Sequence, residues 1–247
     1  MIVTPLHPVL EEILSRVRTA ASEQQSDADC SLDPQSETDK VGTMVRERLL
    51  AGGVAPRYVD ARKEAIKPNR WKAVSGFFTG QSYFIWGPTG VGKTFLASAL
   101  VHEKVTQLVS AAIENKARIV QYPRMVVFVD LLIEIRDCFR ESSETSEKTL
   151  INRYVDCDCL VLDDIGAEKV TEWTVQTLFA IVDKRYRHER QTLFTSNLSL
   201  SDLHAKVGER IASRIAGACG RHNVIELRGG DMRLECPRHD SDMRPAD

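Results

Sequence analysis

The segment GPTGVGKT, residues 87–94, constrains the fold of this 247-residue chain more than any other. It follows the apolar run YFIW and precedes the run TFLASALVHEKV, which predicts a strand, a glycine-rich turn and a helix in that order. Glycines in such a turn let several backbone N–H groups point at one phosphate, beside the positive end of the helix. A turn without a ligand would explain neither the lysine nor the threonine that ends the segment. The segment therefore predicts a nucleotide-binding loop.

The residues of this loop have separate expected roles. Lys93 is expected to pair with the outer phosphates of the nucleotide, and the hydroxyl of Thr94 is expected to bind Mg²⁺. The residues predicted to bind the nucleotide are Gly87, Pro88, Thr89, Gly90, Val91, Gly92, Lys93, Thr94 and Phe95.

Polar residues at two later strand ends suit the same site. The run CLVLDD brings Asp163 and Asp164 to the carboxyl end of a predicted buried strand, where ligands bind in open parallel sheets. We expect Asp163 to bind the metal and Asp164, shorter than a glutamate, to polarise the attacking water. Two such aspartates could also form a solvated turn. The run LFTSN ends in Thr195, Ser196 and Asn197, whose side chains could hydrogen-bond the outer phosphate or the water.

The region from about residue 54 to 235 alternates apolar strands with helical periodicity, which predicts a parallel sheet covered by helices. Candidate strands are SYFIW, part of RIVQYPRMVVFV, CLVLD, QTLFTS and NVIEL. Pro123 forbids an unbroken central strand through the second of these. With 43% apolar and 28% charged residues, the composition excludes collagen-like, disordered and disulfide-scaffold classes.

The first 50 residues differ from the rest of the chain. Apolar residues from Leu6 to Val17 recur at helical spacing, and a polar stretch separates them from a second helical pattern that stops at Gly52 and Gly53. This part holds nine acidic and five basic residues, so it is net negative while the remainder is net positive. Two interpretations stay open: an arm docked on its own domain, or a partner-binding module.

The cysteines and the apolar runs indicate a reduced, cytoplasmic location. No apolar stretch is long enough to cross a membrane, and the N-terminus lacks the pattern of a signal peptide. The pairs Cys219–His222 and Cys236–His239 each have the spacing Cys-x-x-His and could meet at a zinc ion, although chance spacing is the preferred interpretation.

The run GERIASRI places Arg210 and Arg214 four residues apart, on one face of a predicted helix. An arginine can complete the active site of a neighbouring subunit and so couple hydrolysis to assembly. The alternative is that both arginines form ion pairs with Glu209 or with the preceding loop.

These segments together resemble the AAA+ ATPases of the DnaC type, which are bacterial replicative helicase loaders, and the related IstB-type transposition ATPases. The resemblance covers about residues 52–235. GGVAPRY is similar to the family's base-contacting segment, GPTGVGKTFLASAL to Walker A, CLVLDDIGAEKVTEW to Walker B and TSNLSLSDL to sensor 1. GERIASRI is similar to box VII, with the arginine finger at Arg214. ELRGGDMRL resembles the segment that carries sensor 2, here Arg233.

The resemblance implies an α/β AAA+ P-loop fold, a parallel sheet flanked by helices, with a short helical N-terminal arm and no C-terminal lid domain. The implied division is an arm at 1–51, an ATPase domain at 52–239 and a tail at 240–247. The implied function is ATP hydrolysis with Mg²⁺, self-association through the arginine finger, binding of single-stranded DNA, and loading or remodelling of a hexameric replicative helicase. Two alternatives remain: an IstB-like transposition helper acting on duplex DNA, and a regulatory module that binds ATP without hydrolysing it.

The segment FVDLLIEIRDCFRESSETSEKTLI resembles the extra helix that lines a single-stranded DNA path in initiators and loaders. Its apolar positions Leu131, Leu132, Ile135 and Phe139 are expected first of all to pack in the core. The basic residues expected to contact DNA phosphates are Arg136, Arg140 and Lys169.

Overall fold

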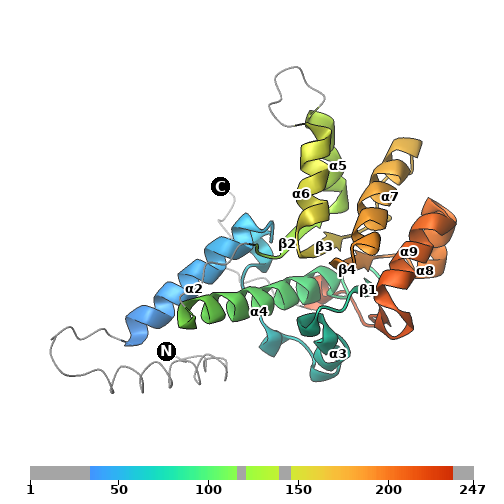
Figure 1. The fold of residues 1–247 in the computed structure, drawn as a ribbon. Helices are drawn as coiled ribbons and strands as arrows, with labels where there is room; N and C mark the ends of the chain where they lie inside the picture. Colours follow the sequence, from blue (N-terminus) through green and yellow to red (C-terminus); the bar gives the residue numbers. More distant parts are fainter. Residues whose placement is uncertain (1–33, 116–120, 139–145, 236–247) are drawn as a thin grey trace, which may run out of the picture.

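The computed structural model describes residues 34–115, 121–138 and 146–235 (Figure 1). The helix expected between Leu6 and Val17 lies outside these residues. In the described chain every candidate strand is present, and the second begins directly after Pro123, with Gln121 and Tyr122 before it outside the strand. The strands are β1 (Tyr83–Trp86), β2 (Arg124–Val127), β3 (Cys159–Asp163), β4 (Gln191–Ser196) and β5 (Val224–Glu226).

The five strands form one parallel sheet in the order β2-β3-β4-β1-β5. Arg124 lies opposite Leu160, and Trp86 lies opposite Ser196, so the carboxyl ends of β1, β3 and β4 meet at one edge of the sheet. The segments after these three strands carry the predicted nucleotide-site residues. A parallel sheet covered on both faces explains why the strands read as nearly continuous apolar runs.

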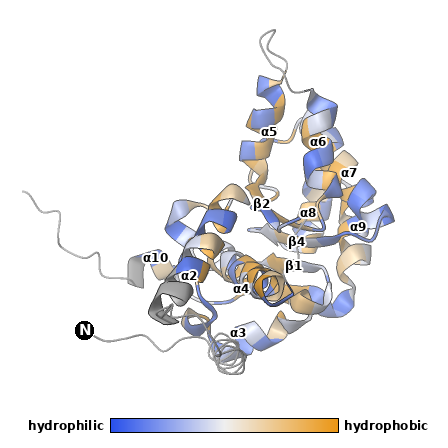
Figure 2. Ribbon diagram, turned by 60° about the vertical axis from the view of Figure 1, so that its left-hand side comes forward, coloured by the Kyte–Doolittle hydropathy of each residue, from blue (hydrophilic) through white to orange (hydrophobic). Residues whose placement is uncertain are grey.

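Helices cover both faces of the sheet (Figure 1). One hydrophobic cluster joins Leu160 and Leu162 of β3 to the helices α5 to α9, and another joins Cys159 and Val161 to α2 and α4. Figure 2 shows the hydrophobic colour concentrated on the strands and on α4, which lies between the sheet and α2. The helices are α2 (Pro34–Ala51), α3 (Pro68–Ala73), α4 (Lys93–Glu114), α5 (Phe128–Asp137), α6 (Glu147–Asp156), α7 (Glu172–Arg187), α8 (Leu200–Val207), α9 (Glu209–Cys219) and α10 (Met232–Glu235).

The helix α2 ends at Ala51, directly before the paired glycines that predicted its end. A hydrogen bond fixes this end to the edge of the sheet. The N–H of Met125 donates to the carbonyl of Gly52 at 2.8 Å. Gly53 has a φ of +94°, and a Cβ there would lie 2.1 Å from the carbonyl oxygen of Met125. Only a residue without a side chain permits this approach. Val45 and Leu49 of α2 are buried in the cluster around α4, so this part of α2 packs on the core that the sheet and α4 share.

The segment expected to hold one extra helix forms two, α5 and α6, which precede β3. Leu131, Leu132 and Ile135 are buried, which confirms their interpretation as core residues, while Phe139 lies outside the described residues. None of the helices described here combines the length and the apolar character that a membrane crossing requires.

Candidate nucleotide-binding site

The glycine-rich loop connects β1 to α4 and has the backbone geometry of a phosphate cradle. Gly90 and Gly92 have φ values of +80° and +97°, a region that residues with a side chain rarely adopt. Gly92 directly precedes the first turn of α4, so the loop ends at the positive end of a 22-residue helix. These features suit an anion held by backbone N–H groups.

Lys93 is buried, and its ammonium group is held inside the loop. Its Nζ donates to the carbonyl oxygens of Gly87 and Pro88, both at 2.9 Å, and to Oδ1 of Asn197 at 2.6 Å. Burial lowers the pKa of Lys93, and the nearby carboxylates of Asp164 and Asp163 oppose that change. The ammonium therefore lies at the centre of the predicted site, between the loop and the ends of β3 and β4.

Asp163 is the last residue of β3, and its side chain is buried with polar partners. The hydroxyl of Thr195 donates to its carboxylate at 2.5 Å, and the hydroxyl of Thr94 donates at 3.0 Å. Burial raises the pKa of Asp163, and the two hydroxyl donors oppose the rise. Thr94 and Asp163, the two residues predicted to bind Mg²⁺, thus lie in direct contact.

The donors at this position fit Mg²⁺, which prefers carboxylate and hydroxyl oxygens. Thr94 and Asp163 would hold the ion, and Asp163 brings a buried negative charge that a cation would compensate. Bound there, Mg²⁺ would neutralise charge on the outer phosphates.

Asp164 and Asn197 extend the network from Lys93. Asp164 adopts a φ of +55°, which turns the chain out of β3, and its Oδ1 accepts from the amide nitrogen of Asn197 at 2.9 Å. Of the three polar residues predicted at the end of β4, only Asn197 is exposed. The hydroxyl of Thr195 donates to the carboxylate of Asp163, and the hydroxyl of Ser196 donates to the carbonyl of Ile165 at 2.7 Å. The hydroxyls of Thr195 and Ser196 therefore have partners within the chain, and Asn197 is the one of the three whose side chain is accessible.

The segment around Arg233 lies over the loop. The N–H of Met232 donates to the carbonyl of Gly90 at 3.0 Å. The charge of Arg233 also lowers the pKa of Lys93, although burial and the carboxylates of Asp164 and Asp163 have larger effects on that pKa. The Asp231 carboxylate lies beside Gly90 and accepts from the N–H of Arg233 at 2.9 Å. Sequence reasoning missed Asp231, because a single aspartate after two glycines is typical of an ordinary turn.

Arg210 and Arg214 lie on α9, away from these groups. Arg214 Nε donates to Asp183 of α7 at 3.1 Å, and its guanidinium lies 6.0 Å from the ring centroids of both Phe179 and Tyr186. Arg210 lies 4.3 Å from the centroid of Phe179. Both arginines share one helix face, as predicted, and Arg214 takes its carboxylate partner from α7 rather than from Glu209 or the preceding loop. No sequence signal pointed to Asp183.

Two of the three predicted DNA contacts, Arg136 and Lys169, lie within the described residues. The guanidinium of Arg136 lies 4.9 Å from the centroid of the Trp173 ring, Lys169 is exposed between β3 and α7, and Arg140 lies outside the described residues. For the zinc hypothesis, Cys219 is buried and His222 is exposed, while Cys236 and His239 are not described. Within the described ranges, no group of three metal-binding side chains is present.

Comparison with known proteins yields a family model and several relatives. The model described as IstB-like ATP binding protein matches residues 74–239. The replicative helicase loader DnaC of Escherichia coli strain K12 is 28% identical over 134 residues, 54% of this chain and 49% of the loader. The replicative helicase loader DnaI of Bacillus subtilis strain 168 is 29% identical over 126 residues, 50% of this chain and 35% of the loader. The chain thus spans about half the length of these curated relatives, or less.

The fold has solved counterparts. The crystal structure of the DnaC helicase loader matches with a TM-score of 0.53 and 23% identity, over 70% of this chain and 98% of that one. The parallel sheet with helices on both faces and a phosphate loop after β1 is that of an AAA+ P-loop domain, which confirms the predicted fold class.

Proposed function

This chain belongs to the family of IstB-like ATP binding proteins, and from that premise we propose that it hydrolyses ATP to load or remodel a replicative helicase. The resemblance inferred from its motifs is thereby confirmed. The relatives that support the helicase assignment are replicative helicase loaders. The observation that carries the proposal is the convergence of Lys93, Thr94, Asp163, Asp164 and Asn197 at one edge of the sheet.

Each of these groups has a role in the proposed reaction. Lys93 exchanges its carbonyl partners for phosphate oxygens when ATP binds, and Thr94 and Asp163 hold Mg²⁺. Asp164 orients and polarises the attacking water, and Asn197 fixes Asp164 relative to Lys93 through its two hydrogen bonds. Arg233, in the segment over the loop, completes the phosphate site. Residues 52–239 are the proposed ATPase domain, with an arm at 1–51 and a tail at 240–247.

Assembly supplies the remaining group. Arg214 is partly exposed on α9, and its neighbours belong to α7 rather than to the phosphate loop or β3. We assign it to the ATP site of a neighbouring subunit, where it stabilises charge that develops on the outer phosphate. ATP then favours the assembled state through contacts that the diphosphate product cannot make. Hydrolysis resets the assembly in the cytoplasm.

Single-stranded DNA is the proposed polymer ligand. Arg136, Lys169 and Arg140 are assigned as phosphate contacts, of which Arg136 is held against Trp173. If replacing Arg136 and Arg140 by Ala leaves ATP-dependent binding of single-stranded DNA unchanged, this assignment is wrong.

The function is tested by ATP hydrolysis measured with single-stranded DNA, with duplex DNA and without DNA, beside the Lys93→Ala variant. Stimulation by single strands that the variant lacks supports a loader. Stimulation by duplex DNA alone supports the second candidate, a transposition helper, which the IstB-like family match favours. No turnover under any condition supports a regulatory module that binds ATP as a structural ligand, and it defeats both ATPase proposals.

A further inference from the structure

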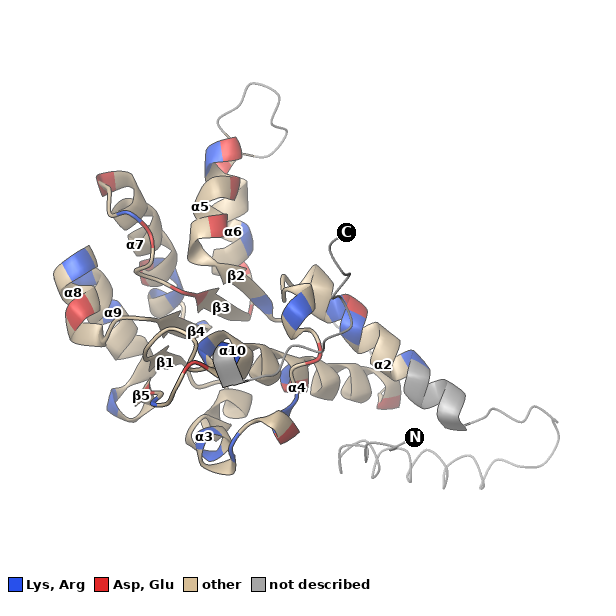
Figure 3. Cartoon of the chain, turned by 180° about the vertical axis from the view of Figure 1, so that it is seen from behind, with Lys and Arg blue, Asp and Glu red and all other residues tan. Residues whose placement is uncertain are grey.

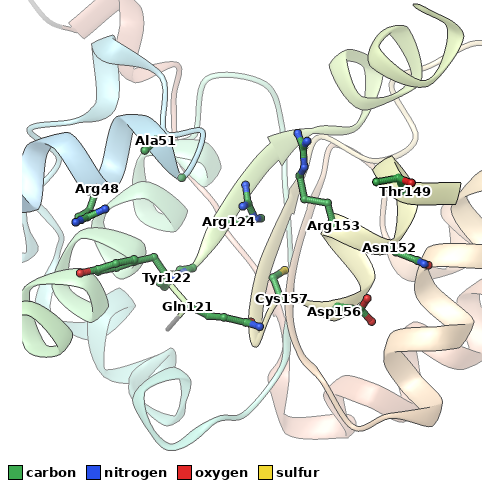
Figure 4. A pocket seen from close by; sticks show the side chains of 12 residues that line it. Arg48, Ala51, Gln121, Tyr122, Arg124, Thr149, Asn152, Arg153, Asp156 and Cys157 are labelled. Atoms are coloured by element: carbon green, nitrogen blue, oxygen red, sulfur yellow. The ribbon is translucent and has the colours of Figure 1, made fainter. Parts of the chain in front are cut away.

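A cavity of about 580 Å³ lies at the outer edge of the sheet, between the end of α2, the start of β2 and the helix α6 (Figure 4). We call it the arginine pocket. Its lining residues are Arg48, Ala51, Gly52, Gln121, Tyr122, Pro123, Arg124, Thr149, Asn152, Arg153, Asp156 and Cys157.

Three separate segments build the arginine pocket, and hydrogen bonds hold them together. The hydrogen bond from the Met125 N–H to the Gly52 carbonyl holds the end of α2 against β2. The side-chain carbonyl of Gln121 accepts from the N–H of Asp158, which ties the chain before β2 to the chain before β3. The cavity is therefore part of the folded domain and needs no rearrangement to exist.

The charge on the arginine pocket is mainly positive. Arg48 and Arg153 are exposed and Arg124 is half-buried, and none of the three forms an ion pair with a carboxylate of the described chain. In Figure 4 the carboxylate of Asp156 points away from Arg124 and Arg153. Burial raises the pKa of the Cys157 thiol in the pocket wall, and the positive charges of Arg185 and then Arg124 oppose that rise.

The arginine pocket lies at the opposite end of the strands from the nucleotide site. Arg124 begins β2 and is paired with Leu160, whereas Asp163 ends β3. Figure 3 shows the positive residues where the start of β2 lies beside α2. A strand of this length spans on the order of 13 Å, so a molecule bound to these arginines leaves the ATP site free.

One wall of the arginine pocket also offers a surface for a flat ring. The guanidinium of Arg48 lies 5.0 Å from the centroid of the Tyr122 ring, and Figure 4 shows the two side chains together. Unpaired bases stack on such rings and guanidinium planes, while guanidinium forks bind phosphates. The lining combines both kinds of group.

We propose that the arginine pocket binds a segment of single-stranded nucleic acid, with phosphates on Arg124 and Arg153 and a base against the Arg48–Tyr122 pair. The inference rests on the proposed binding of single strands and gives it a second site, apart from Arg136 and Lys169. A duplex would not fit, because its bases are stacked on one another and are not available to Tyr122. An acidic peptide would satisfy the arginines but would make no use of the stacking surface.

The test is the affinity of the full chain for a fluorescent oligothymidylate, measured by anisotropy over a range of salt concentrations. Replacing both Arg124 and Arg153 by Ala is expected to weaken binding by about tenfold or more. It should also reduce the slope of log K against log salt by about 1.4, because each single-strand phosphate contact contributes roughly 0.7. Tyr122→Leu is expected to weaken binding by roughly fivefold without changing the slope.

Lys148→Ala is the matched control, because Lys148 is exposed on the same helix as Arg153 but does not line the pocket. Equal weakening by this control would overturn the proposal, as would an unchanged slope in the double variant. Displacement of the oligonucleotide by mononucleotides or inorganic phosphate at low concentration would also overturn it. So would a double variant at Arg124 and Arg153 that no longer binds poly-glutamate but still binds DNA as the wild type does. If the wild-type chain binds no single strands at all, the proposed function itself fails, and that result is distinct from these.

Discussion

The edge of the sheet that carries the phosphate loop and the surface formed by α7 and α9 hold their charged groups in different ways. At the sheet edge, Lys93 and Asp163 are buried, and their partners are other polar groups of the same site. On the α7–α9 surface, Arg214 keeps about a third of its side-chain surface exposed and is held by one carboxylate and two rings. In the first region the charged groups find their polar partners within one chain. The second presents a charge that can reach another molecule.

The largest effect is expected from Lys93→Ala, which removes the central charge of the sheet edge. Phosphate binding should be lost and ATP turnover should fall to background, since no other cation among the described residues hydrogen-bonds to the loop carbonyls of Gly87 and Pro88. Binding of a fluorescent ATP analogue and phosphate release measure the two effects. Turnover close to that of the wild type would mean that the sheet edge is not the catalytic centre.

Arg214→Ala is expected to separate the two regions. DNA-stimulated turnover should fall by roughly a thousandfold, the usual contribution of an arginine supplied by a neighbour, while nucleotide binding is retained. Mixing Arg214→Ala with Lys93→Ala subunits should restore part of the turnover, because one supplies an intact loop and the other an intact arginine. Failure of the mixture to recover any activity would argue that Arg214 acts within its own chain.

Asp183→Asn is expected to have a smaller effect on the same surface. Without the carboxylate, Arg214 keeps its contacts with Phe179 and Tyr186 but loses its ion pair, so turnover should fall several-fold with little change in nucleotide affinity. Arg187→Ala is the control, because it removes the other ion-pair partner of Asp183 and leaves Arg214 in place. Equal effects of the two variants would show that Asp183 has a general structural role only.

The two regions also differ in how far the sequence predicts them. The sheet edge follows from local patterns, because an apolar strand that ends in a polar residue places that residue at the carboxyl edge of a parallel sheet. Lys93, Asp163 and Asn197 could therefore be placed together before the structure was known. The pairing of Arg214 with Asp183 depends on how α9 packs against α7, 31 residues away in the chain, and no spacing encodes it. The hydrogen bond from Thr195 to Asp163 was not predicted, because alternation along a buried strand does not reveal which hydroxyl donates to a neighbouring carboxylate.

The smallest expected effect is a change in the free energy of unfolding. Asp163→Asn should raise that free energy although it removes the activity. Asp163→Asn should abolish turnover while stabilising the nucleotide-free protein by about 1 kcal/mol, or a few degrees in Tm, because it removes a buried charge and keeps an acceptor for Thr195.

Since burial raises the folded-state pKa of Asp163 above its ordinary value of 3.8, the wild type is most stable, with respect to this group, below that value. It loses this stability as the pH rises through the folded-state pKa. The stability advantage of the variant should therefore grow from acidic to neutral pH, and thermal melts across that range would contradict the account if it stayed constant. A constant difference would mean that Asp163 is not desolvated as its burial implies, and the contrast between a buried sheet edge and an accessible α7–α9 surface would weaken accordingly.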